Sequence, residues 1–199
     1  DPSESLGEQY TQPRISALYD ALTPASAGTV SWKELPDRVV VTYEGVPDYS
    51  QTNTNDFQIE MYFNGAIAIK YLTVDAKEVE ACGIRAWKAA GLTLQNCTVK
   101  NAQEGHDGLD IGTHSSDVWL VDWYAQYNGG DGIRIGKGVT ATIDSCRAER
   151  TGQDGLAIDK RADVKINIGF FQYNSGHGID IDKRATVVME NYGYSYVTA

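Results

Sequence analysis

Three aspartates stand directly before a glycine in the second half of the chain, at steps of 24 and 23 residues. They are Asp107, Asp131 and Asp154, and His177 takes the same place one repeat later. Stacked carboxylates repel one another and favour a bound cation such as calcium. The other interpretation is structural, because an aspartate before glycine commonly accepts hydrogen bonds from turn amides. We favour the structural interpretation, since His177 supplies no further oxygen ligand.

A second set of residues has the types needed for proton transfer. Asp110 lies three residues after Asp107, and Arg134 takes the same position in the next repeat. Two of the three histidines, His106 and His114, lie in short insertions on either side of Asp110. An arginine can neutralise a substrate carboxylate while aspartate and histidine abstract and donate a proton. The candidate catalytic residues are therefore Asp110, His106, His114 and Arg134.

The position of Asp110 also has an interpretation without chemistry. On successive repeats it reads Arg85, Asp110, Arg134, Ala157 and Asp180. Oppositely charged residues on neighbouring strands form exposed pairs that contribute roughly a few tenths of a kcal/mol each. The column is then a solvated ladder that joins adjacent repeats.

These residues are positioned by a motif in which a glycine is followed by an aliphatic residue, one further residue and an apolar residue. It occurs five times, with steps of 25, 24, 23 and 23 residues between Gly83, Gly108, Gly132, Gly155 and Gly178. Copies at nearly constant spacing predict a solenoid, in which no copy can bury its apolar face alone.

Each copy contains a second segment of alternating apolar residues, about eleven residues later, and shows no helical period. These segments are Leu92-x-Leu94, Val118-x-Leu120, Ala141-x-Ile143, Val164-x-Ile166 and Val187-x-Met189. A third inward position recurs as Val99, Ala125, Ala148, Phe171 and Tyr194. The pattern predicts an all-β fold, a right-handed parallel β-helix of about five coils stacked about 4.8 Å apart.

Residues 82–199 resemble the parallel β-helix repeats of polysaccharide lyases and mannuronan C5-epimerases, especially in the segments YNGGDGIRI and YNSGHGIDI. The resemblance, which many secreted surface proteins share, implies the fold, because catalytic and inert members have the same repeats. For the catalytic alternative it implies action on a uronate polysaccharide. Arg85 or Arg134 would neutralise the substrate carboxylate, and Asp110 and the two histidines would move the C5 proton.

Three features weigh against catalysis. The chain lacks the Asp-Pro-His-Asp type of motif that mannuronan epimerases carry. Five coils also provide a shorter groove for the substrate than those enzymes usually have. A protein with a formal charge of -10 is poorly matched to a polyuronate unless calcium mediates. We therefore expect a secreted or cell-surface structural or adhesive module without catalysis. The alternatives are a polysaccharide-acting enzyme of the lyase or epimerase type and a non-catalytic glycan-binding module.

The front of the chain has a different pattern. A short helical spacing at 14–22 precedes four strand-like runs, at 29–33, 38–44, 56–63 and 66–74. The dipeptide Asn64-Gly65 between two of these runs predicts a hairpin. This region resembles part of a nidogen-like extracellular domain in the segments ISALYDALTP, GTVSWKELPDRVVVTYEGVP and FQIEMYFNGAIAIKYL.

The expected organisation has four parts. An extended lead-in at 1–13 precedes the partial nidogen-like sheet at 14–76, a joint at 77–81 and the β-helix at 82–199. Four strands and a short helix make a thin core of their own. We therefore expect the sheet to pack on the first coil and cap its apolar end.

Charge, cysteine content and hydropathy limit the classes of partner and cofactor that the chain is expected to bind. Residues 1–81 hold 5 basic and 13 acidic side chains, which argues against nucleic acid as a partner. The cysteines Cys82, Cys97 and Cys146 lack metal-ligand spacing, and Cys97 and Cys146, at the same position two coils apart, are expected to be small apolar fillers. No segment has the roughly 18 apolar residues of a membrane span. The cofactor expectation is none, or calcium.

The last coil has an apolar end that no polar helix or charged strand closes. Such an end is a template for another strand. We expect self-association through this coil or contact with the next part of a longer native chain, with polysaccharide as a further partner.

Overall fold

The computed structural model describes residues 22, 24–47, 55–76, 82–190 and 196–197. These residues form strands and turns and contain no helix. They accordingly provide no apolar helix that could cross a membrane. The short helix expected at 14–22 lies, apart from Leu22, outside the described residues, and the joint expected at 77–81 lies wholly outside them.

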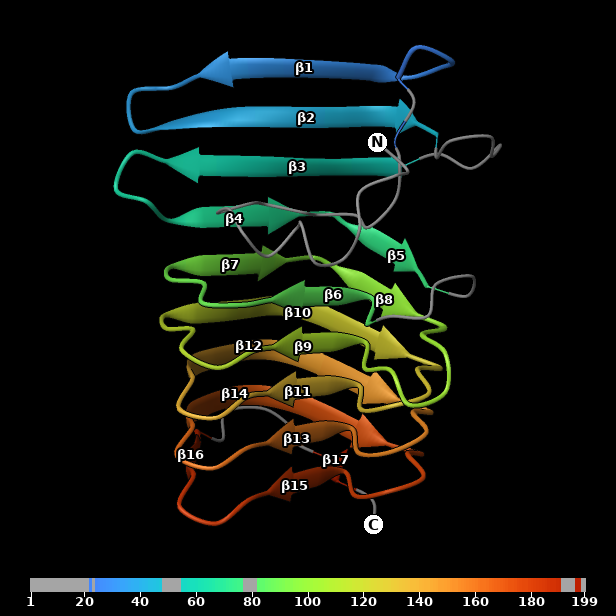
Figure 1. The fold of residues 1–199 in the computed structure, drawn as a ribbon, viewed down its shortest axis with the longest axis vertical. Coiled ribbons are helices and arrows are strands. Elements are labelled where there is room, and N and C mark those ends of the chain that lie inside the picture. The colour runs from blue at the N-terminus through green and yellow to red at the C-terminus, as the bar shows by residue number, and fades with distance from the viewer. Residues whose placement is uncertain (1–21, 23, 48–54, 77–81, 191–195, 198–199) are drawn as a thin grey trace.

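The five copies of the glycine motif form one sheet of parallel strands (Figure 1). The strands are β6 (Ile84–Ala86), β9 (Leu109–Ile111), β11 (Ile133–Ile135), β13 (Leu156–Ile158) and β15 (Ile179–Ile181). They pair in register, so that Leu109, Ile133 and Leu156 stack directly on one another and are fully buried. The predicted β-helix of about five coils is thereby confirmed.

The second and third segments of each coil form the other walls. The strands are β7 (Leu92–Gln95), β8 (Thr98–Lys100), β10 (Val118–Gln126), β12 (Thr140–Glu149), β14 (Asp163–Gln172), β16 (Thr186–Met189) and β17 (Tyr196–Val197). The chain bends at Asn96, Asp122 and Ser145, whose φ angles are 53°, 49° and 66°. Each bend turns the chain from the second wall into the third.

The inward residues of the third wall stack as the sequence predicts. Val99, Ala125, Ala148 and Phe171 follow one another in register and are buried. The next register partner of Phe171 is Val197, whereas Tyr194 was expected there and lies outside the described residues. The cysteines are buried and free, and Cys97 and Cys146 flank the larger Trp123 in one inward column. Small residues on both sides of a large one keep such a column filled, as expected for apolar fillers.

The front strands continue the second wall edge to edge (Figure 1). The strands β1 (Thr29–Glu34), β2 (Arg38–Val46), β3 (Asn55–Tyr62) and β4 (Ile67–Lys70) pair antiparallel in sequence order. The predicted hairpin at Asn64-Gly65 is confirmed, with Gly65 at a φ of 89°. Strand β4 then pairs parallel with β7, so the antiparallel sheet joins the β-helix through backbone hydrogen bonds.

The run expected as one strand at 66–74 is two strands. Tyr71, at a φ of 62°, separates β4 from β5 (Thr73–Asp75), and β5 pairs parallel with β8. Together β4 and β5 form an additional partial coil that lacks a described strand in the first wall. Phe57, Leu72 and Val74 belong to the same buried cluster as the coils and cover their open end.

Candidate functional site

The aspartate column binds backbone amides of the next coil. Asp107 Oδ1 accepts a hydrogen bond from the amide of Asp131 at 2.8 Å, and Asp131 Oδ1 accepts one from the amide of Asp154 at 2.9 Å. Asp154 Oδ1 accepts the amide hydrogen of His177 at 2.6 Å. This geometry supports the structural interpretation of the column. A calcium site at Asp107, Asp131 and Asp154 stays a prediction.

Burial makes two of these carboxylates, Asp107 and Asp131, weaker acids. Burial raises the pKa of Asp131 to about 6, with contributions from the charges of Asp107 and Asp154 and against the hydrogen bond from the Asp154 amide. Burial also raises the pKa of Asp107. At neutral pH, burial therefore destabilises the ionised carboxylate of Asp131, although this carboxylate accepts a hydrogen bond that holds two coils together.

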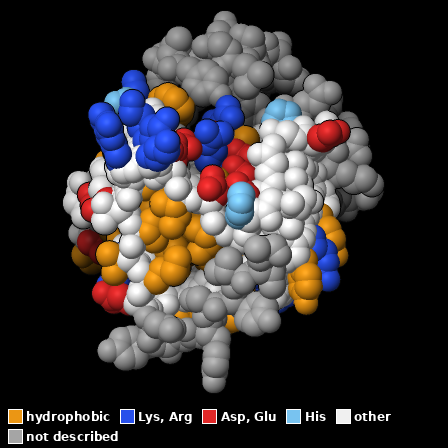
Figure 2. All heavy atoms as spheres, turned by 90° about the horizontal axis from the view of Figure 1, so that it is seen from below, with side chains coloured by type: hydrophobic (Ala, Val, Ile, Leu, Met, Phe, Trp, Pro, Cys, Tyr) orange, Lys and Arg blue, Asp and Glu red, His pale blue; other side chains and the backbone are white. Residues whose placement is uncertain are grey.

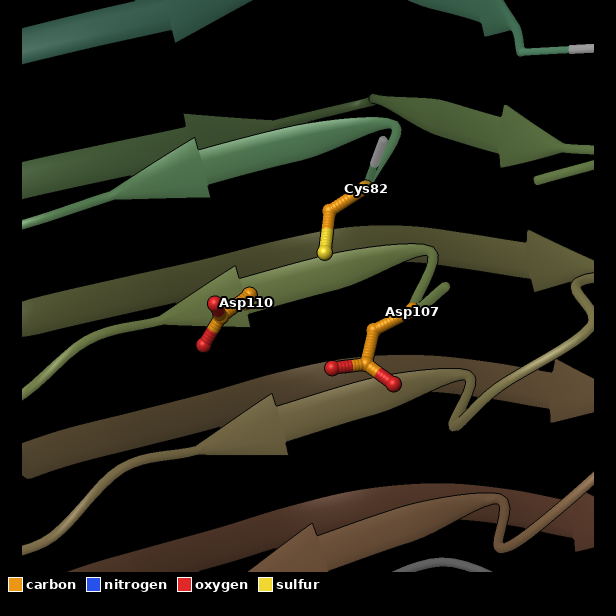
Figure 3. Close-up of side chains that lie close together, drawn as sticks. All are labelled: Cys82, Asp107 and Asp110. Atoms are coloured by element: carbon orange, nitrogen blue, oxygen red, sulfur yellow. The ribbon is translucent and has the colours of Figure 1, made fainter. Parts of the chain in front are cut away.

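Three side chains with metal-binding or catalytic atoms meet at the start of the first wall (Figure 3). They are Cys82, just before β6, Asp107, just before β9, and Asp110 on β9, and their ligand atoms lie within 4.8 Å of one another. Arg85 enters the same cluster, donating from Nε to Asp110 Oδ2 at 2.9 Å and from Nη2 to Cys82 Sγ at 3.3 Å. Arg85 thus supplies the positive charge of this cluster.

This cluster suits an ion-pair network better than a metal ion. Burial raises the pKa of the Cys82 thiol, so the thiol stays protonated at neutral pH, whereas a metal ligand must be a thiolate. The guanidinium of Arg85 also repels a cation. The arrangement neutralises Asp110 and ties β6 to β9.

The structure brings together only part of the candidate catalytic set. Asp110 and Arg134 are register partners on β9 and β11, but Arg134 Nη2 lies 3.3 Å from Asp159 Oδ2. His106 lies in the turn before β9, and His114 lies in the turn after it, with Nδ1 3.2 Å from Thr113 Oγ1. In the described part of the chain, no hydrogen bond joins either histidine to Asp110 or Arg134.

The outward column has the expected register. Arg85, Asp110, Arg134, Ala157 and Asp180 follow one another on adjacent strands. Arg85 and Asp110 form the expected cross-strand pair. Arg134 departs from the ladder because Asp159, in the turn after β13, lies within reach of its guanidinium.

Sequence reasoning missed two asparagines, one buried and one half-buried, that hold the corner between the third and first walls. Asn128 Oδ1 accepts the amide hydrogen of Ala102 at 3.1 Å, and Asn174 Oδ1 accepts that of Thr151 at 3.2 Å. A Cβ added at Gly108 or Gly155 would lie 2.5 or 2.4 Å from the respective asparagine Nδ2. The sequence signal for these asparagines was the Tyr-Asn pair in YNGGDG and YNSGHG. Their close approach explains why the motif has glycine at Gly108 and Gly155.

The family model described as a right-handed β-helix region matches residues 58–192, more than half of the chain. The chain belongs to the right-handed β-helix family. The match begins within β3, before the first glycine motif, in agreement with the parallel pairing of β4 and β5 to the coils. No curated protein and no solved structure matches the chain. The likeness to lyases and epimerases and the nidogen-like interpretation of 14–76 stay predictions.

The raised pKa of Asp131 predicts a specific pH dependence. Between pH 3.8, its ordinary pKa, and about pH 6, the folded chain holds a proton that the unfolded chain has released. The contribution of Asp131 to the free energy of unfolding therefore falls as pH rises through this window, by on the order of 3 kcal/mol. Asp131→Asn keeps an acceptor for the amide of Asp154 and removes the titration. We expect this variant to be more stable than wild type at neutral pH and similar to it near pH 4.

Urea unfolding across this pH range measures the effect. Asp163→Asn, at an exposed position, is the matched control and should leave the pH slope of wild type unchanged. Stabilisation of wild type by millimolar calcium that Asp131→Asn abolishes would contradict this interpretation of the column.

Proposed function

We propose that this chain is a structural module of a secreted or cell-surface assembly and performs no chemistry itself. The observation that supports this most directly is the pairing of Asp110, the central member of the candidate catalytic set, with Arg85 at 2.9 Å. The pair occupies Asp110 Oδ2 with a donor of the same chain, so that a substrate proton would have to compete with the guanidinium of Arg85 for this oxygen. The neighbouring Asp107 is buried and already accepts an amide hydrogen bond.

The ends of the β-helix favour a role in assembly. In the last coil Ile181 is 46 % exposed and Met189 48 %, whereas the matching residues one coil earlier, Ile158 and Ile166, are each 2 % exposed. Hydrophobic side chains gather near the centre of this end of the molecule (Figure 2). Among the described strands, none pairs with the outer edges of β15 and β16.

Among the described strands, the opposite end of the same sheet is also an open edge. Strand β1 is exposed along its whole length, and Trp32 on it is 72 % exposed. Two different open ends on one molecule favour a head-to-tail contact, which repeats into a filament unless the rotation closes. The proposed module therefore self-associates through its last coil, and a following coil of a longer native chain would use the same surface.

The first test of this proposal is turnover. The intact chain, incubated with alginates and pectates with and without calcium, should produce no new reducing ends and no unsaturated products above a buffer blank. Asp110→Ala should give the same result as wild type, because Asp110 serves the ion pair alone. Product formed by wild type and lost in Asp110→Ala would overturn the proposal and establish the enzyme alternative.

The second test is assembly. Sedimentation of wild type should show larger species as the concentration rises about a hundredfold, and Met189→Lys should remain monomeric because it places a charge in the apolar end. Val188→Lys is the matched control, since Val188 is in register with the outward Lys165 and is similarly exposed. A wild type that stays monomeric throughout, or equal effects of both substitutions, would contradict assembly through this end.

A further inference from the structure

Glu149 is a carboxylate on the outer face of the third wall, yet only 1 % of it is exposed. Its oxygens accept hydrogen bonds of 2.5 to 3.1 Å from five side chains, those of Tyr124, Gln126, Arg147, Arg150 and Gln172. Burial opposes its ionisation, but the hydrogen bonds and the charge of Arg147 outweigh this and lower the pKa of Glu149 to about 2. The ionised carboxylate fixes two guanidinium groups from below.

Both arginines also lie over aromatic rings. Arg147 Cζ is 5.5 Å from the ring centroid of Tyr124, and Arg150 Cζ is 5.6 Å from those of Tyr127 and Tyr173. The side chains of Arg147 and Arg150 nevertheless remain 48 % and 46 % exposed. Within this hydrogen-bonded network two positive charges oppose the single negative charge of Glu149, so the network carries one positive charge in excess. Its cations are rigid, partly desolvated and open to a partner.

A groove of about 350 Å³ adjoins Arg147. It is lined by Trp123, Ser145, Cys146, Arg147, Phe170 and Gln172. The volume is at the low end for binding sites and suits one side chain or one ring. Arg147 uses Nε and Nη2 for Glu149, and its Nη1 has no partner among the described residues. The groove therefore combines the unpaired Nη1 edge of a guanidinium with an amide, a hydroxyl and two aromatic rings.

We propose that this surface binds an acidic segment of a protein partner, with one aspartate or glutamate carboxylate in the groove beside Arg147. We call it the arginine–aromatic face and define it as Tyr124, Tyr127, Arg147, Arg150, Phe170 and Tyr173. Arginine, tyrosine and phenylalanine are the anchors that dominate protein interfaces, and a planar guanidinium suits a carboxylate. The inference deepens the proposed structural role by naming a partner class, and it rests on that role because the partner is bound and not cleaved.

The same contacts favour a protein over a glycan or a nucleic acid. Sugar rings stack on open aromatic faces, whereas Tyr124, Tyr127 and Tyr173 each already hold a guanidinium over one face. Nucleic acids bind through many cations at once, and here the excess is a single positive charge on a chain of formal charge -10. An isolated carboxylate within a peptide matches that single charge.

A labelled peptide with blocked termini and a single glutamate among glycines and serines tests the inference by fluorescence anisotropy on the intact chain. We expect it to bind, and the same peptide with glutamine in place of glutamate to bind at least about tenfold more weakly, because a hydrogen-bonded charge is lost. Arg147→Ala should weaken binding of the glutamate peptide about tenfold or more. Lys165→Ala, which removes one positive charge from an outward position on β14, is the matched control and should change the affinity less than about twofold.

Arg147→Ala removes a partner of Glu149, so its fold is checked by circular dichroism. If the Arg147→Ala variant is unfolded, Phe170→Leu is the alternative variant. It removes the phenyl ring from the groove without removing a partner of Glu149, and it should also weaken binding several-fold. Equal binding of the two peptides, equal effects of the arginine and lysine substitutions, or tighter Arg147-dependent binding of oligogalacturonate would each overturn the inference. Cleavage of oligogalacturonate in the same mixture would instead overturn the proposed function, so the two failures are distinguishable.

Discussion

Parallel hydrogen bonding between successive coils is the constraint on which the rest of this structure depends. A coil has no core of its own, so each inward residue is covered by the same position in the coils before and after it. The amides of Leu109 and Ile133, for example, donate to Gly132 and Gly155 of the next coil at 3.1 and 3.0 Å. A slip of one residue would turn every inward side chain outward. Register therefore dominates the choice of residues inside and outside the coils.

The polar side chains serve the same register. Asp107, Asp131 and Asp154 carry hydrogen bonds from coil to coil, and Glu149 gathers donors from three adjacent coils. Residue types that elsewhere transfer protons or bind metals are here partners of backbone amides and arginines. This use of ionisable groups supports the proposed structural role. It leaves recognition to the surfaces where charge and aromatic area remain open.

The sequence was sufficient to predict those structural features that recur in every coil. Glycine spacing and period-two apolar segments predict the coils, their inward columns and the outward position of Asp110, because each depends on residues that recur at one interval. The break at Tyr71 was not predictable, since a tyrosine rarely adopts a positive φ. The inward position of the last third-wall strand was predicted at Tyr194, whereas the register partner of Phe171 is Val197, because the spacing after Phe171 is longer than one repeat. The environment of Glu149 depends on side chains from three coils, and no short motif encodes it.

Amide hydrogen exchange tests most directly the central claim that the front strands and the coils form one hydrogen-bonded structure in common register. The comparison is between β4, which precedes the repeats, and β7 and β10, which lie within them. The account predicts that amides of all three strands open with free energies within about 1 kcal/mol of one another. Exchange of the β4 amides that is orders of magnitude faster, with β7 and β10 still protected, would show that the front sheet is a separate unit and would contradict the claim.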